Sequence, residues 1–355
     1  MRKTLLALGF ITVLLAVIIA CGYYRNFKRH EYKADYARTE VDTELDLSDK
    51  KVGVLVYRFS DNYMTLFRRE LEKDLIQAGF KKENIEILDS SDSKIVQDLQ
   101  IRTLINNNID ALVINPVDAS DVGRITELAV ESEIPLIYVN REPDAFEESR
   151  WEENEWDVAY VGCDARQSGT IQGKLITDLG KENVDKNGDG VIQYMMLKGD
   201  AKSADAQFRT ECCVTAMSSV GWDIECVYED SADWDRLKAQ ELVSAAIEEH
   251  PETEVIFANN DAMALGALTA VERSGKRAGK DVLIVGVDAL TDALIAIQEG
   301  QMVGTVYNDY IQQAQSTTDA LITYLRGESN PYLISCDYVP VTPDNAQTIL
   351  ENLAQ

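Results

Sequence analysis

Nine residues, Asp185–Gln193, combine oxygen-bearing side chains and two glycines in a spacing that suits a calcium ion. Gly190 stands sixth, where such a loop turns sharply, and glycine permits that turn. An Asp- and Asn-rich surface turn without metal is the alternative interpretation. Zinc or copper would require His or Cys, which this stretch lacks. The oxygen ligands, at positions 1, 3, 5, 7 (a backbone carbonyl) and 9, would be Asp185, Asn187, Asp189, Val191 and Gln193.

The stretch departs from a helix–loop–helix calcium site at its end. Position 12, normally a bidentate Glu, is Met196. The chain there runs into an apolar stretch of strand length, Val191–Leu197. We therefore expect the missing carboxylate to come from another part of the chain.

Asp or Asn side chains follow five apolar runs that we interpret as strands. Short carboxylates and amides accept or donate hydrogen bonds to several hydroxyls at once, which suits a neutral polyol. Each of these residues on its own could instead be a helix N-cap, a role that Asp and Asn favour. The residues are Asp61 and Asn62, Asn115, Asn259–Asp261, Asp288, and Asn308 and Asp309.

Aromatic and basic side chains accompany this polar set. Tyr63 and Trp234 could cover the apolar C–H faces of a pyranose ring, although packing in the core is the simpler explanation for either one alone. Arg209 offers a rigid fork of donors that can reach a ring oxygen and a neighbouring hydroxyl.

Strand-length apolar runs alternate with stretches of helical period from residue 52 onward, which predicts parallel sheets built from βαβ units. Ligands of such sheets lie beyond the carboxyl ends of the strands. A length of 355 residues exceeds one core of about 250–300 residues and predicts two domains. The predicted helices are Met64–Gln77, Asp121–Glu131, Ala204–Met217, Arg236–Glu249 and Ile311–Arg326.

Composition excludes several function classes. The chain has 34 basic and 61 acidic residues, a net charge of −27, which argues against nucleic acid as a partner. Two His residues make a His-rich metal site improbable. The five cysteines after Cys21 are odd in number and without metal-type spacing, so we interpret them as small core residues.

The N-terminal segment is interpreted as an export signal. A basic start precedes an apolar run, Leu5–Ala20, that ends at Cys21. This ending resembles the bacterial lipoprotein signal, in which the Cys is lipidated; a retained signal anchor is the alternative. Residues 22–47 are charge-rich and predict a solvated tether.

The body of the chain resembles the galactose/glucose-binding proteins of the type I periplasmic binding protein family over residues 50–345. The matching stretches are YRFSDNYM, ALVINPVDA, NREP, YVGCDARQSGTIQG, DKNGDGVIQ, LKGDAKSADAQFRT, FANNDAMALGA, VGVDAL and GTVYND. The resemblance implies an α/β fold of two Rossmann-like lobes with parallel sheets, joined by three hinge crossovers. The lobes would be 48–139 with 308–337 and 140–307 with 338–355, and the crossovers would lie near Tyr138–Arg141, Tyr307–Asp309 and Cys336–Pro340.

The resemblance also implies roles for individual residues. Glu254 would complete the calcium site. Ser203 stands where the family has a His, and Tyr63 replaces a Phe, so the expected sugar is left open between galactose, glucose and others. The implied sugar contacts are Asp61, Tyr63, Asn115, Ser203, Asp205, Arg209, Trp234, Asn260, Asp288 and Asn308.

The implied function is capture of galactose, glucose or a related monosaccharide or glycoside by hinge closure, with delivery to an ABC transporter permease. We expect a monomer with structural Ca²⁺, lipid-anchored on the extracellular face of the cell membrane, or periplasmic where an outer membrane exists. Alternatives are a sugar sensor with the same pocket, a pentose ligand, or a glycosidase with paired carboxylates. A repressor of the same architecture is disfavoured by the export signal, the acidic charge and the lack of a basic helix-turn-helix. No enzymatic activity is expected.

Overall fold

The computed structural model describes residues 45–353. The predicted signal segment, Cys21 and the tether up to residue 44 lie outside this range. Within it, none of the helices combines the length and the apolar character needed to cross a bilayer. The described residues belong to one compact unit.

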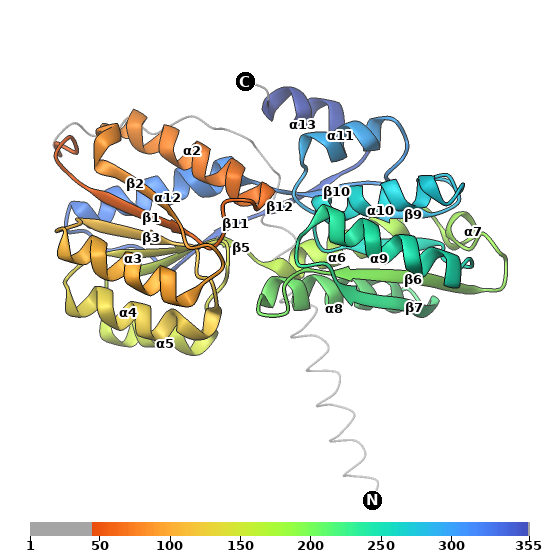
Figure 1. The fold of residues 1–355 in the computed structure, drawn as a ribbon, viewed down its shortest axis with the longest axis horizontal. Helices are drawn as coiled ribbons and strands as arrows, with labels where there is room; N and C mark the ends of the chain where they lie inside the picture. The colour runs from red at the N-terminus through yellow and green to blue at the C-terminus, as the bar shows by residue number, and fades with distance from the viewer. Residues whose placement is uncertain (1–44, 354–355) are drawn as a thin grey trace, which may run out of the picture. The chain divides into compact units, whose positions relative to one another are not determined.

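The first lobe is built on a six-stranded parallel sheet with the order β11-β5-β4-β3-β1-β2. Figure 1 shows α2 and α12 on one face of this sheet and α3, α4 and α5 on the other. The inner strands are buried along their whole length, as expected of a sheet covered on both faces. The elements are β1 (Val52–Val56), α2 (Asn62–Ala78), η1 (Lys82–Asn84), β2 (Ile85–Asp89), α3 (Lys94–Asn106), β3 (Ala111–Ile114), η2 (Ala119–Asp121), α4 (Val122–Glu131), β4 (Leu136–Val139), α5 (Ala145–Asn154), β5 (Val158–Cys163), α12 (Tyr310–Leu325) and β11 (Leu333–Cys336).

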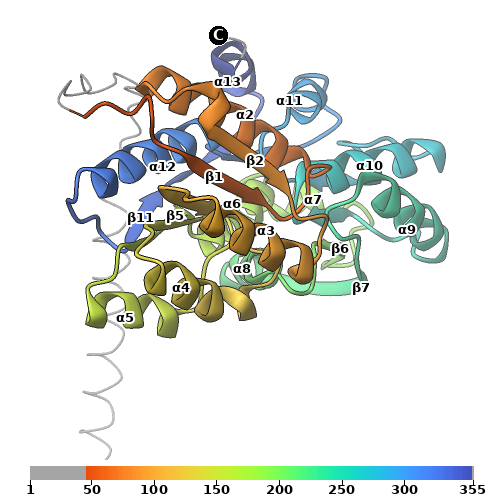
Figure 2. The same cartoon turned by 60° about the vertical axis from the view of Figure 1, so that its left-hand side comes forward.

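The second lobe is built on a four-stranded parallel sheet with the order β7-β6-β8-β9. Helices pack in two pairs, α6 with α8 and α9 with α10. A separate antiparallel pair, β10 with β12, lies between the two sheets in Figure 1. Figure 2 shows α9 and α10 side by side. The elements are α6 (Ala165–Thr177), α7 (Lys181–Val184), β6 (Val191–Lys198), α8 (Ala204–Ser219), β7 (Asp223–Ser231), α9 (Arg236–Glu249), β8 (Val255–Ala258), α10 (Asp261–Arg273), β9 (Leu283–Val285), α11 (Thr291–Gln298), β10 (Thr305–Asn308), β12 (Tyr338–Val341) and α13 (Ala346–Leu353).

The predicted alternation of strands and helices and the parallel sheets are confirmed, but one predicted lobe boundary is wrong. The sequence interpretation placed the first crossover near Tyr138–Arg141 and assigned residues 140–307 to the second lobe. In the structure α5 returns the chain to the first sheet, where β5 pairs with β4 and β11. The acidic segment Ala145–Asn154 lacks a strong apolar period, so its helix was not expected from the sequence. The chain therefore leaves the first lobe only after Cys163.

Two glycines let α6 approach α8 very closely. A Cβ at Gly169 would lie 2.7 Å from the backbone oxygen of Arg209. A Cβ at Gly173 would lie 2.6 Å from the backbone oxygen of Cys213 and 2.5 Å from the Cβ of Ala216. The backbone of α8 occupies the space that any larger side chain would need, so these glycines fix the position of α8.

Gly173→Ala is expected to destabilise the protein by about 1–2 kcal/mol, because overpacking against a backbone outweighs the improved helix propensity. Urea-induced unfolding measures the difference. Thr170→Ala, at a partly exposed position of the same helix, is the matched control and should stay within about 0.5 kcal/mol of wild type. A Gly173→Ala protein as stable as wild type would contradict the close packing of α6 on α8.

Candidate functional site: a polar pocket between the lobes

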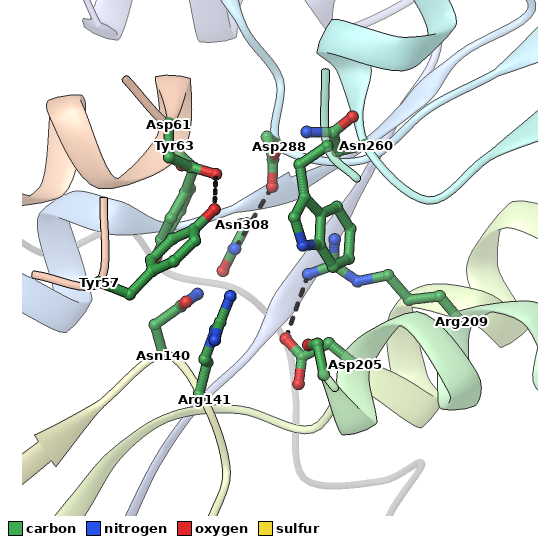
Figure 3. Close-up of a pocket in the computed structure, with 12 residues that line it drawn as sticks. Tyr57, Asp61, Tyr63, Asn140, Arg141, Asp205, Arg209, Asn260, Asp288 and Asn308 are labelled. Atoms are coloured by element: carbon green, nitrogen blue, oxygen red, sulfur yellow. Dashed lines mark hydrogen bonds and ion pairs between the residues drawn. The ribbon is translucent and has the colours of Figure 1, made fainter. Parts of the chain in front are cut away.

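A pocket with about 360 Å³ of empty space lies between the two lobes (Figure 3). Nine of the ten predicted sugar contacts line the pocket; Asn115 does not. The lining residues are Tyr57, Asp61, Tyr63, Asn140, Arg141, Ser203, Asp205, Arg209, Trp234, Asn260, Asp288 and Asn308.

Asp61 and Asn260 each cap a helix and also line the pocket, so the two roles considered for them from the sequence are both present. The Asp61 carboxylate accepts a hydrogen bond from the Met64 backbone N–H at 2.8 Å and so caps α2. Its other oxygen accepts from the Tyr57 hydroxyl at 2.7 Å, as Figure 3 shows. Asn260 caps α10 through the Met263 N–H at 3.0 Å. Both side chains also line the pocket, so their positions are fixed by the ends of helices.

Asn115 has a different role from the predicted one. It is fully buried, and its side-chain oxygen accepts from the Tyr57 backbone N–H at 3.3 Å. Its amide nitrogen lies 3.1 Å from the Val139 carbonyl and 3.3 Å from the Asn140 side-chain oxygen. Asn115 therefore joins the carboxyl ends of β1, β3 and β4 beneath the pocket, and positions Tyr57 and Asn140 rather than lining the cavity itself.

Arg209 is the buried cation on the second-lobe side. It is 3% exposed and donates to the Asn259 carbonyl at 2.7 Å and to the Tyr338 hydroxyl at 3.0 Å. Its ion-pair partner is Asp205, one helical turn earlier, at 3.6 Å (Figure 3). Burial raises the pKa of Asp205, although Arg209 and Arg141 act to lower it. The Arg209 Nε is buried and has no hydrogen-bond partner among the described residues.

The indole ring of Trp234 lies directly against the backbone of Gly199. A Cβ at Gly199 would come within 2.1 Å of the ring. The loop that carries Trp234 is unusual, because Asp233 and Trp234 have positive φ angles of 50° and 64°. Such angles cost free energy for non-glycine residues and tend to persist where function requires them.

Asp288 and Asn308 form the part of the pocket nearest to the crossovers. The Asn308 amide nitrogen lies 3.4 Å from Asp288, and the Asn308 oxygen accepts from Gln313 at 2.7 Å. Asp288 is 4% exposed, and burial raises the pKa of its carboxyl well above the usual range despite the opposing effect of Arg209. Its φ angle of 116° places it in a region that only glycine normally occupies.

Three lining residues, Tyr57, Asn140 and Arg141, were missed by the sequence interpretation. Asn140 and Arg141 directly follow β4, so the strand-end rule that identified Asn115 would also have found them. Arg141 donates to the carbonyls of Pro116 at 3.1 Å and Val117 at 2.5 Å. Its remaining terminal nitrogen has no hydrogen-bond partner but lies 3.7 Å from the Asp200 carboxylate, within ion-pair distance.

The predicted calcium ligands lie together in the loop between α7 and β6. Asp185 accepts from the backbone N–H groups of Gly188 at 2.7 Å and Gly190 at 2.9 Å, and the Asn187 and Asp189 side chains both hydrogen-bond Gln193. Glu254, at the start of β8, reaches this loop and accepts from the backbone N–H groups of Lys186, Asn187 (3.1 Å) and Gln193 (3.3 Å).

The carboxylate and amide oxygens of this loop are ligands of the kind that a hard cation takes. The Lys181 ammonium also reaches the loop, where it donates to the Gly190 carbonyl. Burial raises the pKa of Glu254, while the backbone N–H groups of Asn187, Lys186 and Gln193 act to lower it. Within residues 45–353, no cluster of three or more His, Cys, Asp or Glu side chains is placed to hold a metal. A cation here would accordingly depend on the amide oxygens and the Val191 carbonyl as well as on the carboxylates.

Comparison with known proteins assigns the chain to a family. A family model described as a periplasmic binding protein domain matches residues 52–329. The D-galactose/methyl-galactoside binding periplasmic protein of Haemophilus influenzae is 33% identical over 319 residues, covering 86% of this chain and 93% of that protein. A putative rhizopine-binding protein of Rhizobium meliloti is 30% identical, covering 83% of this chain and 90% of its own length.

Solved structures show the same architecture. An ABC transporter solute binding protein from Bacillus halodurans with bound myo-inositol matches with a TM-score of 0.75 and 25% identity, covering 86% of this chain and 99% of that one. A galactofuranose binding protein matches in fold with a TM-score of 0.76. The two-lobed fold, the family match and the pocket between the lobes agree, and the chain belongs to the periplasmic binding protein family.

Proposed function

We propose that this protein captures a monosaccharide, or a small glycoside of one, between its lobes. The observation that carries the proposal is the convergence of three carboxylates, three amides and two guanidinium groups with an indole ring in one pocket. Carboxylates accept hydrogen bonds from hydroxyl pairs, amides complete both donor and acceptor needs, and an aromatic ring covers the apolar face of a sugar. The ligand would be buried between two sheet edges, where such bonds are stronger than in water.

Galactose and glucose are the first candidates, because a relative of 33% identity is named for D-galactose and methyl-galactosides. A pentose is the second candidate. The ribose import binding protein of Bacillus subtilis is 26% identical over 292 residues, and Ser203 leaves the adjoining end of the pocket with a short neutral side chain.

The family match supports delivery of the sugar to an ABC transporter permease. Signalling through a sensor partner is the alternative use of the same pocket. We propose a lipid anchor at Cys21, on the strength of the apolar run that precedes it. Two acyl chains would hold the protein stably at the membrane surface. We propose that it is a monomer there, on the extracellular face of the membrane or in the periplasm where an outer membrane exists.

Titration calorimetry of the chain lacking residues 1–21 tests the binding proposal. The panel is D-galactose, D-glucose, D-xylose, D-ribose and methyl-galactosides, with calcium present. One-to-one binding of a hexose supports the first candidate, and binding of a pentose alone supports the second. Incubation with aryl glycosides tests the glycosidase alternative, since release of the aryl group would identify an enzyme.

Gly199→Ala is expected to weaken sugar binding by about tenfold, because the added methyl group displaces the Trp234 ring that would stack on the sugar. Calorimetry measures the affinity, and circular dichroism confirms that the fold is retained. Ala201→Ser, an exposed position in the same loop, is the control and should bind as wild type. Unchanged affinity in Gly199→Ala would exclude Trp234 as a stacking partner.

Asp205→Ala is expected to alter discrimination between sugars more than Trp234→Ala does. Removing the carboxylate also leaves the Arg209 guanidinium buried with its ion-pair partner missing, which is costly. Trp234→Ala removes only non-directional contact and should reduce affinity for all sugars by similar factors. The measurement is the ratio of dissociation constants across sugars that differ at single hydroxyls. Equal losses for all sugars in Asp205→Ala would contradict the assignment.

We also propose that the loop Asp185–Gln193 with Glu254 binds a structural Ca²⁺. What supports this is the set of oxygen ligands, three of them carboxylates (Asp185, Asp189 and Glu254), and the reach of Glu254 into the loop. The ion would tie the start of β6 to the start of β8 and neutralise part of the local negative charge.

Glu254→Gln is expected to abolish most of the calcium-dependent gain in melting temperature while leaving sugar affinity unchanged. Calcium at about 100 times its dissociation constant would add about 2.7 kcal/mol to the wild-type protein. Differential scanning calorimetry with calcium and with chelator measures the gain. Glu252→Gln, two residues away, is the control and should keep it. A wild-type protein that melts identically with and without chelator would refute the calcium site.

A further inference from the structure

Arg58 lies beside the pocket without lining it. It follows Tyr57 at the carboxyl end of β1, in the first lobe, and is partly buried. One terminal nitrogen of its guanidinium lies 3.4 Å from the Tyr57 hydroxyl. The same hydroxyl donates to the pocket carboxylate of Asp61. Arg58 is therefore one step removed from a group that faces the ligand.

The same nitrogen of Arg58 reaches across to the second lobe. It donates to the backbone carbonyl of Asp233, in the loop after β7, at 3.2 Å. The next residue is Trp234, whose ring lines the pocket. Arg58 thus connects Asp61, through the Tyr57 hydroxyl, with the loop residue that precedes Trp234. It does so without lining the pocket.

The acceptor is held firmly in place. The Asp233 carboxylate accepts from the Ser231 hydroxyl at 2.9 Å and pairs with Lys238 at 2.5 Å. The positive φ angles of Asp233 and Trp234 give this loop a conformation with few alternatives. A rigid carbonyl is a good acceptor, because little conformational freedom is lost when the arginine engages it.

A second arginine repeats the arrangement from the same tyrosine. The guanidinium of Arg141 lies 3.9 Å from the centre of the Tyr57 ring, and that of Arg58 lies 5.3 Å from it. Arg141 pairs with Asp200, in the loop after β6, at 3.7 Å. Tyr57 is therefore the first-lobe support for two cationic side chains that both cross to the second lobe.

We propose that Arg58 is a clasp that holds the two lobes together over a bound ligand. This inference rests on the proposed function, and it assigns a role to a residue that makes no ligand contact. The clasp forms only when the loop Ser231–Trp234 meets the end of β1. It therefore stabilises the closed arrangement by the same amount whichever sugar is inside.

Ligand-contacting residues and the clasp should therefore affect sugar affinities in different ways, which binding kinetics can distinguish. A ligand-contacting residue changes the ratio of affinities between sugars, whereas the clasp scales all affinities by one factor. Since closure follows the first encounter, loss of the clasp should act mainly on dissociation.

The test uses the full chain in mild detergent and stopped-flow Trp fluorescence with D-galactose, D-glucose and D-ribose. Arg58→Gln is expected to raise the dissociation rate about tenfold for each sugar that binds, with the association rate within about twofold of wild type. A charge-assisted hydrogen bond at a partly buried residue such as Arg58 contributes less free energy than a fully buried one, so the expected change in dissociation rate is modest. Lys202→Gln, an exposed cation next to Ser203, is the charge-matched control and should leave both rates unchanged.

Small-angle X-ray scattering of the sugar-free protein gives a reading that does not depend on any ligand. Arg58→Gln is expected to have a larger radius of gyration than wild type. An unchanged dissociation rate, unequal factors between sugars, or an unchanged radius of gyration would overturn the clasp. Failure of the wild-type protein to bind any of the sugars would instead refute the proposed function, and the scattering comparison would then decide the clasp alone.

Discussion

The charge of Arg209 is the constraint on which the pocket depends. Burying a guanidinium that is only 3% exposed is costly unless its charge and donors find partners. Its partners come from three parts of the chain, although its Nε has none: the Asn259 carbonyl after β8, the Tyr338 hydroxyl on β12, and Asp205 on its own helix. Burial acts to lower the pKa of Arg209, but Tyr338, Asp205 and Asp288 outweigh it and raise that pKa. The close approach of α6 at Gly169 fixes the backbone of the same residue. The second-lobe half of the pocket is thus ordered around one cation.

Much of this arrangement was predictable because it follows from rules that act along the sequence. Buried parallel strands are read from apolar runs, and their polar ends meet at one edge of the sheet, so the strand-end residues Asp61, Asn260, Asp288 and Asn308 lie in one pocket. Ser203 and Asp205 also line it, but they were expected only from the resemblance to the galactose/glucose-binding proteins. The rule failed at Asn115, because a strand-end amide can turn inward as easily as outward. Here its three hydrogen bonds join neighbouring strands below the cavity.

Other features depend on contacts between distant parts of the chain and had no local signal. The place of β5 at the sheet's interior was hidden because α5 is rich in charge and weak in apolar period. The pairing of β10 with β12 is antiparallel and joins segments that are far apart in the sequence. Arg58 gave no signal either, since an arginine after a strand is ordinary until the carbonyl of Asp233 is placed beside it.

Asp61 and Asn260 cap helices and also face the cavity. This combination limits how the sugar preference of such a protein can change during evolution. Replacing either one weakens a helix end as well as a ligand contact, so a variant with new selectivity would first have to tolerate a loss of stability. Ser203 has no side-chain capping bond to its helix. Evolutionary change in the preferred sugar is therefore less constrained at Ser203 than at Asp61 or Asn260, and Ser203 is one of the positions where this chain departs from the galactose/glucose-binding pattern.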